Sequence, residues 1–173
     1  MSWSRAGISA LFLLFIFVLQ EAAISKVNLP IGGFSLYLAV LLGLMALDDR
    51  SGAIVLGFIG GLILDLSPSV ESPVGKWAFV LTIIGYIFST NRESIGDFTQ
   101  RPVAFVFFTA LGSVLTLLAF LFIGLLLGEN NGSVWHNFAT VFGNGIWTLI
   151  FSPILLPLLV KWRALTLTSR ERQ

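Results

Sequence analysis

The sequence predicts an all-α, polytopic membrane protein with six transmembrane helices in a single domain, residues 1–173. The first observation is composition, because 56% of the residues are hydrophobic, 11% are charged and the mean hydropathy is +0.93. A soluble domain of this length cannot bury so much apolar surface. The second is that charges and turn residues divide the chain into six apolar stretches. The third is that no stretch alternates with the period of two that a membrane barrel strand requires.

The six apolar stretches predict the individual spans. The first two have the ordinary length of about 20 residues, the next two are short, and the last two are long enough to tilt. A cleavable signal peptide is the alternative for the first stretch, but Gln20 and Glu21 stand where small residues would mark cleavage. The predicted spans are residues 6–24, 29–47, 53–66, 74–89, 102–127 and 134–160.

Lysine and arginine predict which side of the membrane each connection faces. Six spans place both termini on one side, together with the connections at 48–52 and 90–101. That side carries eight of the ten basic residues. The eight are Arg5, Arg50, Arg92, Arg101, Lys161, Arg163, Arg170 and Arg172, and the two on the opposite side are Lys26 and Lys76. Because cytoplasmic loops carry the excess of basic residues, both termini are expected in the cytoplasm.

The residues that the chain lacks exclude several kinds of site. Without cysteine it has no thiolate nucleophile and no thiolate metal ligand, and His136 is the single histidine. The formal net charge is +1, and the basic residues are scattered, so nucleic acid is not an expected partner. We therefore expect no enzymatic activity, no metal and no cofactor.

Glycines on the third stretch indicate close helix packing. Gly57 and Gly61 are four residues apart, and Gly60 lies beside them. In lipid, this spacing lets a second helix backbone approach closely. One interpretation is a docking face for a partner protein. The other is tight packing within the six-helix bundle, which the motif by itself favours.

Asp65 is an acidic residue at the outer end of the third stretch. A carboxylate is poorly placed at the C-terminus of its own helix, so it requires a positive partner. Ser72 and Pro73 read as the start of the next helix, with Lys76 in its first turn. The sequence predicts that Asp65 contacts this helix start or Lys76. A catalytic role would require a second titratable group within reach, and no span contains one well inside it.

Asn144 is the one amide expected deep within the membrane. It stands between two glycines in the sixth stretch, and a buried amide usually forms a hydrogen bond with a neighbouring helix. Pro153 and Pro157 follow and predict a kink in the second half of this helix. A broken helix with an amide can also form a substrate site, as in transporters. No second interrupted helix lies in a mirrored position, so packing is favoured.

Residues 57–86 resemble the rod shape-determining protein MreD family, especially its actinobacterial type. The residues that carry the resemblance are Gly57, Gly60, Gly61, Leu62, Asp65, Gly75, Trp77, Ala78, Gly85 and Tyr86. The chain length and the six-span layout are similar as well. The resemblance implies a non-enzymatic scaffold of the cell-wall elongation machinery in the bacterial plasma membrane, required for rod shape. It implies partnership with MreC and, through it, with RodA, a class B penicillin-binding protein and MreB, within membrane lipid. It also implies the fold of the substrate-binding subunits of energy-coupling factor transporters.

A substrate-binding subunit of a vitamin transporter is the alternative function. Length and span number fit it, and the outer side carries Trp77, Trp135, His136, Asn130 and Asn131. The connection at 21–28 is short for a lid, and no cluster of polar groups converges on a cavity. A membrane enzyme acting on lipid is disfavoured, because no facing pair of acids, histidines or arginines is present.

Overall fold

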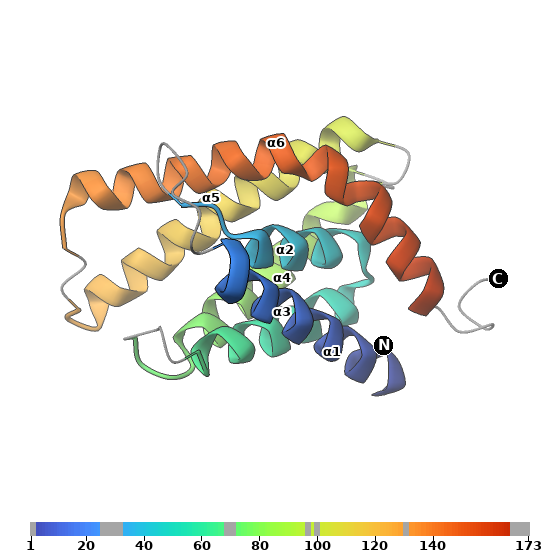
Figure 1. Cartoon of the computed structure of the whole chain (residues 1–173), viewed down its shortest axis with the longest axis horizontal. Helices are drawn as coiled ribbons and strands as arrows, with labels where there is room; N and C mark the ends of the chain where they lie inside the picture. Colours follow the sequence, from blue (N-terminus) through green and yellow to red (C-terminus); the bar gives the residue numbers. More distant parts are fainter. Residues whose placement is uncertain are drawn as a thin grey trace.

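A computed structural model describes residues 3–24, 33–67, 72–95, 98, 101–129 and 132–166. This part of the chain is all-α, with six α-helices and one short π-helix, so the predicted fold class is confirmed at that level. The helices lie side by side, and both chain termini lie at one end of the bundle (Figure 1). The elements are α1 (Trp3–Leu19), η1 (Gln20–Ile24), α2 (Leu36–Leu47), α3 (Arg50–Asp65), α4 (Lys76–Ile95), α5 (Pro102–Leu126) and α6 (Val134–Thr166).

Helix α2 is the centre of the bundle. It contacts each of the other five α-helices, and every residue from Tyr37 to Leu47 is buried. A helix that is apolar on all sides can occupy such a position, because no side has to face water. The Ser35 hydroxyl caps its N-terminus by accepting the N–H of Leu38 at 3.1 Å. The Gln20 side chain adds a second cap, because its Oε1 accepts the N–H of Leu36 at 2.8 Å.

The helix described within the second predicted span, residues 29–47, is shorter than that span. Residues 29–32 lie outside the described part of the chain, and residues 33–35 precede the helix. The 12 residues of α2 give a rise of about 18 Å, which is well short of a hydrocarbon core about 30 Å thick. Apolar composition predicted a helix in this segment, but it did not show where the helix begins or that the helix is buried.

The other helix boundaries also depart from the predicted spans. Helices α1 and α3 begin three residues earlier, and α4 and α6 each continue six residues further. At the end of α4, Thr90 Oγ1 and Asn91 Nδ2 donate hydrogen bonds to backbone carbonyls one turn earlier, at 3.0 Å and 2.9 Å. Beyond the apolar stretch, these polar side chains therefore form hydrogen bonds with the backbone of α4, which continues there as a helix. The sequence prediction had taken the end of the apolar stretch for the end of the helix.

Helix α6 contains Pro153 and Pro157 in its interior. Neither ring can donate a hydrogen bond to the carbonyl one turn earlier, so the backbone ladder is interrupted twice. Figure 1 shows α6 turning away from its initial direction toward the C-terminus of the chain. The kink that the prolines predicted is therefore present.

Two helices, α5 and α6, are long and apolar enough to cross a membrane, and α1 and α2 are shorter apolar helices. The inner faces of α5 and α6 are rich in small and polar residues, whereas many of their leucines and phenylalanines are exposed. The buried residues include Thr109, Gly112, Ser113 and Thr116 on α5 and Gly143, Asn144, Thr148 and Ser152 on α6. Soluble proteins place large apolar side chains inside. This reversed arrangement is typical of helices that face lipid.

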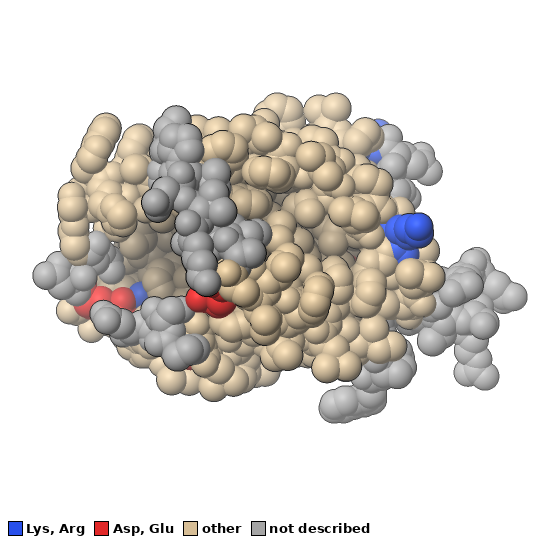
Figure 2. Space-filling view, viewed as in Figure 1, with Lys and Arg blue, Asp and Glu red and all other residues tan. Residues whose placement is uncertain are grey.

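Most of the described lysine and arginine residues lie at one end of the bundle. On the face shown in Figure 2, blue atoms lie mainly toward the end at which the C-terminus lies, and red atoms lie toward the opposite end, with a small blue group beside them. Arg50, Arg101, Lys161 and Arg163 belong to helix ends at the end with the termini. This division accords with the expected cytoplasmic position of both termini. Lys26, Arg170 and Arg172 lie outside the described residues, as do Asn130 and Asn131.

Candidate functional site

Helices α3 and α4 form the most extensive helix contact of the bundle, and the glycines that the sequence singled out lie in it. Gly57 and Gly61 are buried against the backbone of α4. A Cβ atom on Gly61 would lie 2.5 Å from the carbonyl oxygen of Trp77 and 2.6 Å from the N–H nitrogen of Ala78. Gly85 of α4 likewise allows the two backbones to lie close together, because a Cβ atom on it would lie 2.6 Å from the carbonyl oxygen of Ala53. We call this contact the glycine seam.

Gly60 faces a different neighbour. A Cβ atom at this position would lie 2.6 Å from the terminal methyl groups of Leu41 on α2. The Tyr37 hydroxyl donates a hydrogen bond to the Gly60 carbonyl at 2.8 Å. Gly57, Gly60 and Gly61 of α3 therefore bring two helices close, α4 on one side and the central helix α2 on the other.

The interpretation of Gly57 and Gly61 as a docking face for a partner is wrong. Helix α4 of the same chain occupies that face, and both glycines are buried by it. Sequence spacing shows that a backbone must come close, but it does not show whose backbone it is. The packing interpretation describes this seam.

Asp65, the last residue of α3, links that helix to the start of α4 at one end of the glycine seam. Its Oδ1 accepts the N–H of Trp77 at 3.0 Å, and its Oδ2 accepts the N–H of Ala78 at 2.9 Å. These are unpaired donors of the first turn of α4, where the helix dipole favours a negative charge. Asp65 as a whole is only 6% exposed. The link that the sequence predicted between Asp65 and the start of the next helix is therefore observed.

The start of α4 itself differs from the prediction. The helix begins at Lys76, and neither Ser72 nor Pro73 belongs to it. Gly75 precedes the helix with φ of +97°, a left-handed conformation that favours glycine. The capping group comes from Asp65, which is distant in sequence, so the local serine–proline pattern pointed to the wrong residue. The Ser72 hydroxyl has no hydrogen-bond partner among the described residues.

Lys76 pairs with Glu129 and not with Asp65. Its ammonium group lies 2.5 Å from Oε2 of Glu129, and its side chain is only 1% exposed. The same ammonium lies 3.7 Å from the ring centroid of Phe120, a cation–π contact. Trp77 stacks on the same ring at 4.0 Å. This cluster joins the start of α4 to α5 and to the connection that leads to α6.

Asn144 belongs to a row of buried polar side chains between α5 and α6. Its Oδ1 accepts hydrogen bonds from the hydroxyls of Ser113 at 3.0 Å and Thr148 at 3.3 Å. One turn toward the termini, the Thr109 and Ser152 hydroxyls lie 2.9 Å apart. We call these five residues the polar row. Each hydroxyl of the row and the Asn144 carbonyl oxygen has a hydrogen-bond partner on the neighbouring helix or within its own helix, as expected for polar groups in an apolar interior.

The sequence analysis missed several partners in these clusters. Spacing could have identified the polar row, because Thr109 and Ser113 are four residues apart, as are Asn144, Thr148 and Ser152. Nothing in the sequence pairs Lys76 with a residue 53 positions away. Within the described residues, no group of three or more histidine, aspartate or glutamate side chains is arranged to hold a metal ion.

Comparisons with protein-family models, with curated proteins and with solved structures found no significant match to this chain. The likeness to the substrate-binding subunit fold therefore remains a prediction. The resemblance to the MreD family likewise depends on the residues of α3 and α4 themselves.

Proposed function

We propose that this protein is a non-enzymatic membrane scaffold of the bacterial cell-wall elongation machinery, required for rod shape. It works in the plasma membrane with a single-pass MreC-type partner. Through that partner it associates with the glycan polymerase RodA, a class B penicillin-binding protein and, where present, MreB. The role is that of the MreD family, which residues 57–86 resemble.

The observation that supports the proposal is that the residues resembling the MreD family join α3 to α4. Gly57 and Gly61 bring α3 against α4, and Asp65 caps α4 with both carboxylate oxygens. A carboxylate engaged in this way is held by backbone N–H groups. Proton transfer would need a second titratable group as its hydrogen-bond partner. These residues fix the shape of a helix pair. A protein that acts by presenting a rigid surface to partners needs helices held in a fixed arrangement.

The surface that meets the partner is proposed to lie outside the glycine seam, since α4 already covers it. Exposed apolar side chains are available on several helices, among them Leu11 on α1, Phe79 on α4 and Leu115 on α5. Each lies on the exterior, so replacing it perturbs the interior little. A photo-crosslinking residue at each of these positions will show which helix contacts MreC in living cells.

The test combines depletion with crosslinking in the organism that carries the gene. Depletion should convert rods to rounded cells, and at least one exposed position should crosslink to MreC. Normal rod shape after depletion, together with no crosslink from any helix, would contradict the proposal. A vitamin retained by the purified protein and detected by mass spectrometry would support the transporter alternative instead.

A further inference from the structure

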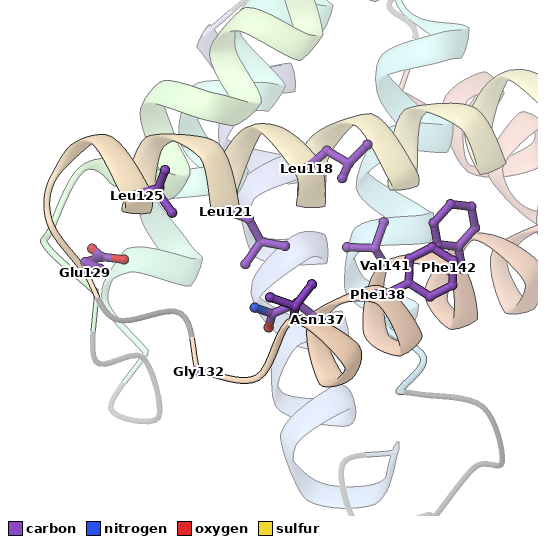
Figure 3. A pocket seen from close by; sticks show the side chains of 10 residues that line it. Leu118, Leu121, Leu125, Glu129, Gly132, Asn137, Phe138, Val141 and Phe142 are labelled. Atoms are coloured by element: carbon purple, nitrogen blue, oxygen red, sulfur yellow. The ribbon is translucent and has the colours of Figure 1, made fainter.

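The apolar surface of the bundle is taller on one side than on the other. Helices α5 and α6 lie on one side of the central helix α2, and α3 and α4, with α1 beside α3, lie on the other (Figure 1). Exposed apolar residues on α5 extend from Val103 to Leu127, a rise of about 36 Å. Figure 3 shows leucines spaced along α5 almost to its end, with Glu129 beyond it. We call α5 and α6 the tall side.

Helices α1, α3 and α4 form the short side. On α3, the apolar surface begins after exposed Ser51 and ends at Leu66, just beyond the helix, a rise of about 22 Å. The apolar stretch of α4 runs from Trp77 to Phe88, a rise of about 17 Å, and exposed polar residues follow soon after it. Helix α1 ends after 17 residues, and exposed Glu21 follows in η1. Each of these surfaces is shorter than a hydrocarbon core about 30 Å thick.

The basic residues at the ends of the short side do not extend its apolar surface. A lysine or arginine near a helix end often reaches outward to the headgroups and so compensates for a short helix. Arg50 turns inward instead, because its Cζ lies 5.4 Å from the ring centroid of Tyr86, within the helical part of α4. Lys76 at the other end is buried in its pair with Glu129. A guanidinium at the level of Tyr86 requires water or headgroups there, because a charge in hydrocarbon is costly.

We propose that, in a bilayer without partner proteins, the short side thins the surrounding membrane and binds phospholipids with short acyl chains. On α3 the apolar surface falls about 8 Å below the thickness of the core, whereas on α5 it exceeds that thickness by about 6 Å. A long helix removes its excess by tilting, but tilting makes a short helix span even less. Thinning of the lipid is the response that remains on the short side. The inference requires that the bundle lies in a bilayer, and it does not depend on the scaffold role.

The side chains of the short side favour lipid over a second protein chain as the occupant. Helices in membranes approach each other through small residues, and Gly57, Gly60 and Gly61 already pack against α4 and α2. Tyr86 is exposed beside Arg50, and tyrosine with a basic residue is typical of the level of the headgroups. The remaining exposed surface consists of large apolar side chains, among them Leu11, Phe15, Phe58, Leu62, Phe79 and Ile83.

The experiment measures the depth of single spin labels in vesicles of dioleoyl phosphatidylcholine. The chain contains no cysteine, so Ser51→Cys, Phe58→Cys and Leu66→Cys each provide one labelling site, and all three positions are exposed along α3. Electron paramagnetic resonance compares the collisions of each label with oxygen, which concentrates in hydrocarbon, and with a nickel chelate, which stays in water. Nickel collisions should exceed oxygen collisions at both Ser51 and Leu66 and fall below them at Phe58. A flat core about 30 Å thick would cover all three labels.

Each other pattern of collisions overturns the proposal. An excess of oxygen collisions at all three sites would exclude thinning, and an excess of nickel at one end only would show a helix displaced toward one surface. Nickel collisions at Phe58 would show that the short side lies outside the hydrocarbon. Few collisions with either reagent at Phe58 would show that a second copy or another protein covers it. If Ser51→Cys fails to fold, Thr90→Cys reports on the same end from α4, where Thr90 is exposed.

The selection of short acyl chains is tested by native mass spectrometry. Full-length protein in mild detergent is mixed with equal amounts of dimyristoleoyl and dioleoyl phosphatidylcholine, and the shorter lipid should be retained in excess. Thr90→Leu lengthens the apolar surface of α4 and should shift retention toward the longer lipid. Thr140→Leu on the tall side is the matched control, because each threonine hydroxyl donates to a backbone carbonyl one turn earlier. Equal retention of both lipids by the wild type, or an equal shift in the two variants, would contradict the selection.

Discussion

Replacing Asp65 by alanine should lower the free energy of unfolding by about 3 kcal/mol. Loss of a helix N-cap costs up to about 2 kcal/mol, and loss of a buried charge that complements the helix dipole adds about 1 kcal/mol. Two hydrogen bonds to a charged acceptor would give about 3–6 kcal/mol as an upper bound. Side-chain hydrogen bonds in membrane proteins average only about 0.6 kcal/mol, because the denatured chain in a micelle also finds partners. Asp65→Asn keeps one acceptor and should lose about half as much as alanine.

Unfolding in mixed micelles of mild detergent and dodecyl sulfate, followed by tryptophan fluorescence, measures this loss. Asp49→Ala is the control for an exposed carboxylate at a helix start: Asp49 makes no side-chain cap hydrogen bond to α3, and its Oδ2 accepts an exposed hydrogen bond from the Ser51 hydroxyl at 2.7 Å. It should change stability by no more than about 0.5 kcal/mol. The capping argument would be refuted if Asp65→Ala unfolded at the same dodecyl sulfate fraction as the wild type. Loss of rod-shape function in Asp65→Asn at unchanged stability would show that the carboxylate has a chemical role.

Three further predictions concern the glycine seam, the ion pair and the polar row, all read from the same micelle titration. Gly61→Ala should destabilise the protein by about 2–4 kcal/mol, because the added Cβ would meet the backbone of α4. Gly7→Ala is the control: its Cβ would meet nothing within 4 Å, so this variant should be as stable as the wild type or slightly more stable. Glu129→Gln should cost about 3 kcal/mol by leaving the buried Lys76 ammonium without its counter-charge, and adding Lys76→Met should recover most of that loss. A double variant as unstable as Glu129→Gln would contradict the ion-pair argument. Asn144→Ala should cost about 1–2 kcal/mol through two lost hydrogen bonds, and a change below 0.3 kcal/mol would show that the polar row re-pairs without it.

The position of α2 shows why the sequence could not predict the arrangement of the helices. In water, an apolar face marks the side of a helix that is buried. In lipid the exterior is as apolar as the interior, so leucine is equally suited to both. The stretch from Leu36 to Leu47 therefore looked like an ordinary span, although it is the most buried helix of the bundle.

Small and polar residues carried more information than the apolar ones. Gly57 and Gly61 predicted a close backbone, and Asp65 predicted a positive partner at a helix start, because each has a requirement that lipid cannot meet. Asn144 predicted a hydrogen bond to a neighbouring helix for the same reason. The identity of each partner depended on which helices meet. The neighbour of Gly61 was therefore left open, and Lys76, the alternative partner expected for Asp65, pairs with Glu129 instead.

The sequence by itself determined an all-α chain of apolar helices, the glycine positions of close contact and the need of Asp65 for a helix start or a cation. These follow from composition, helical spacing and the chemistry of single side chains. Only the tertiary structure decided that α4 fills the seam, that α2 is central and that Lys76 reaches Glu129. The physical reason is that such pairings join residues far apart in sequence, and a bilayer rewards the apolar surfaces of every competing arrangement almost equally.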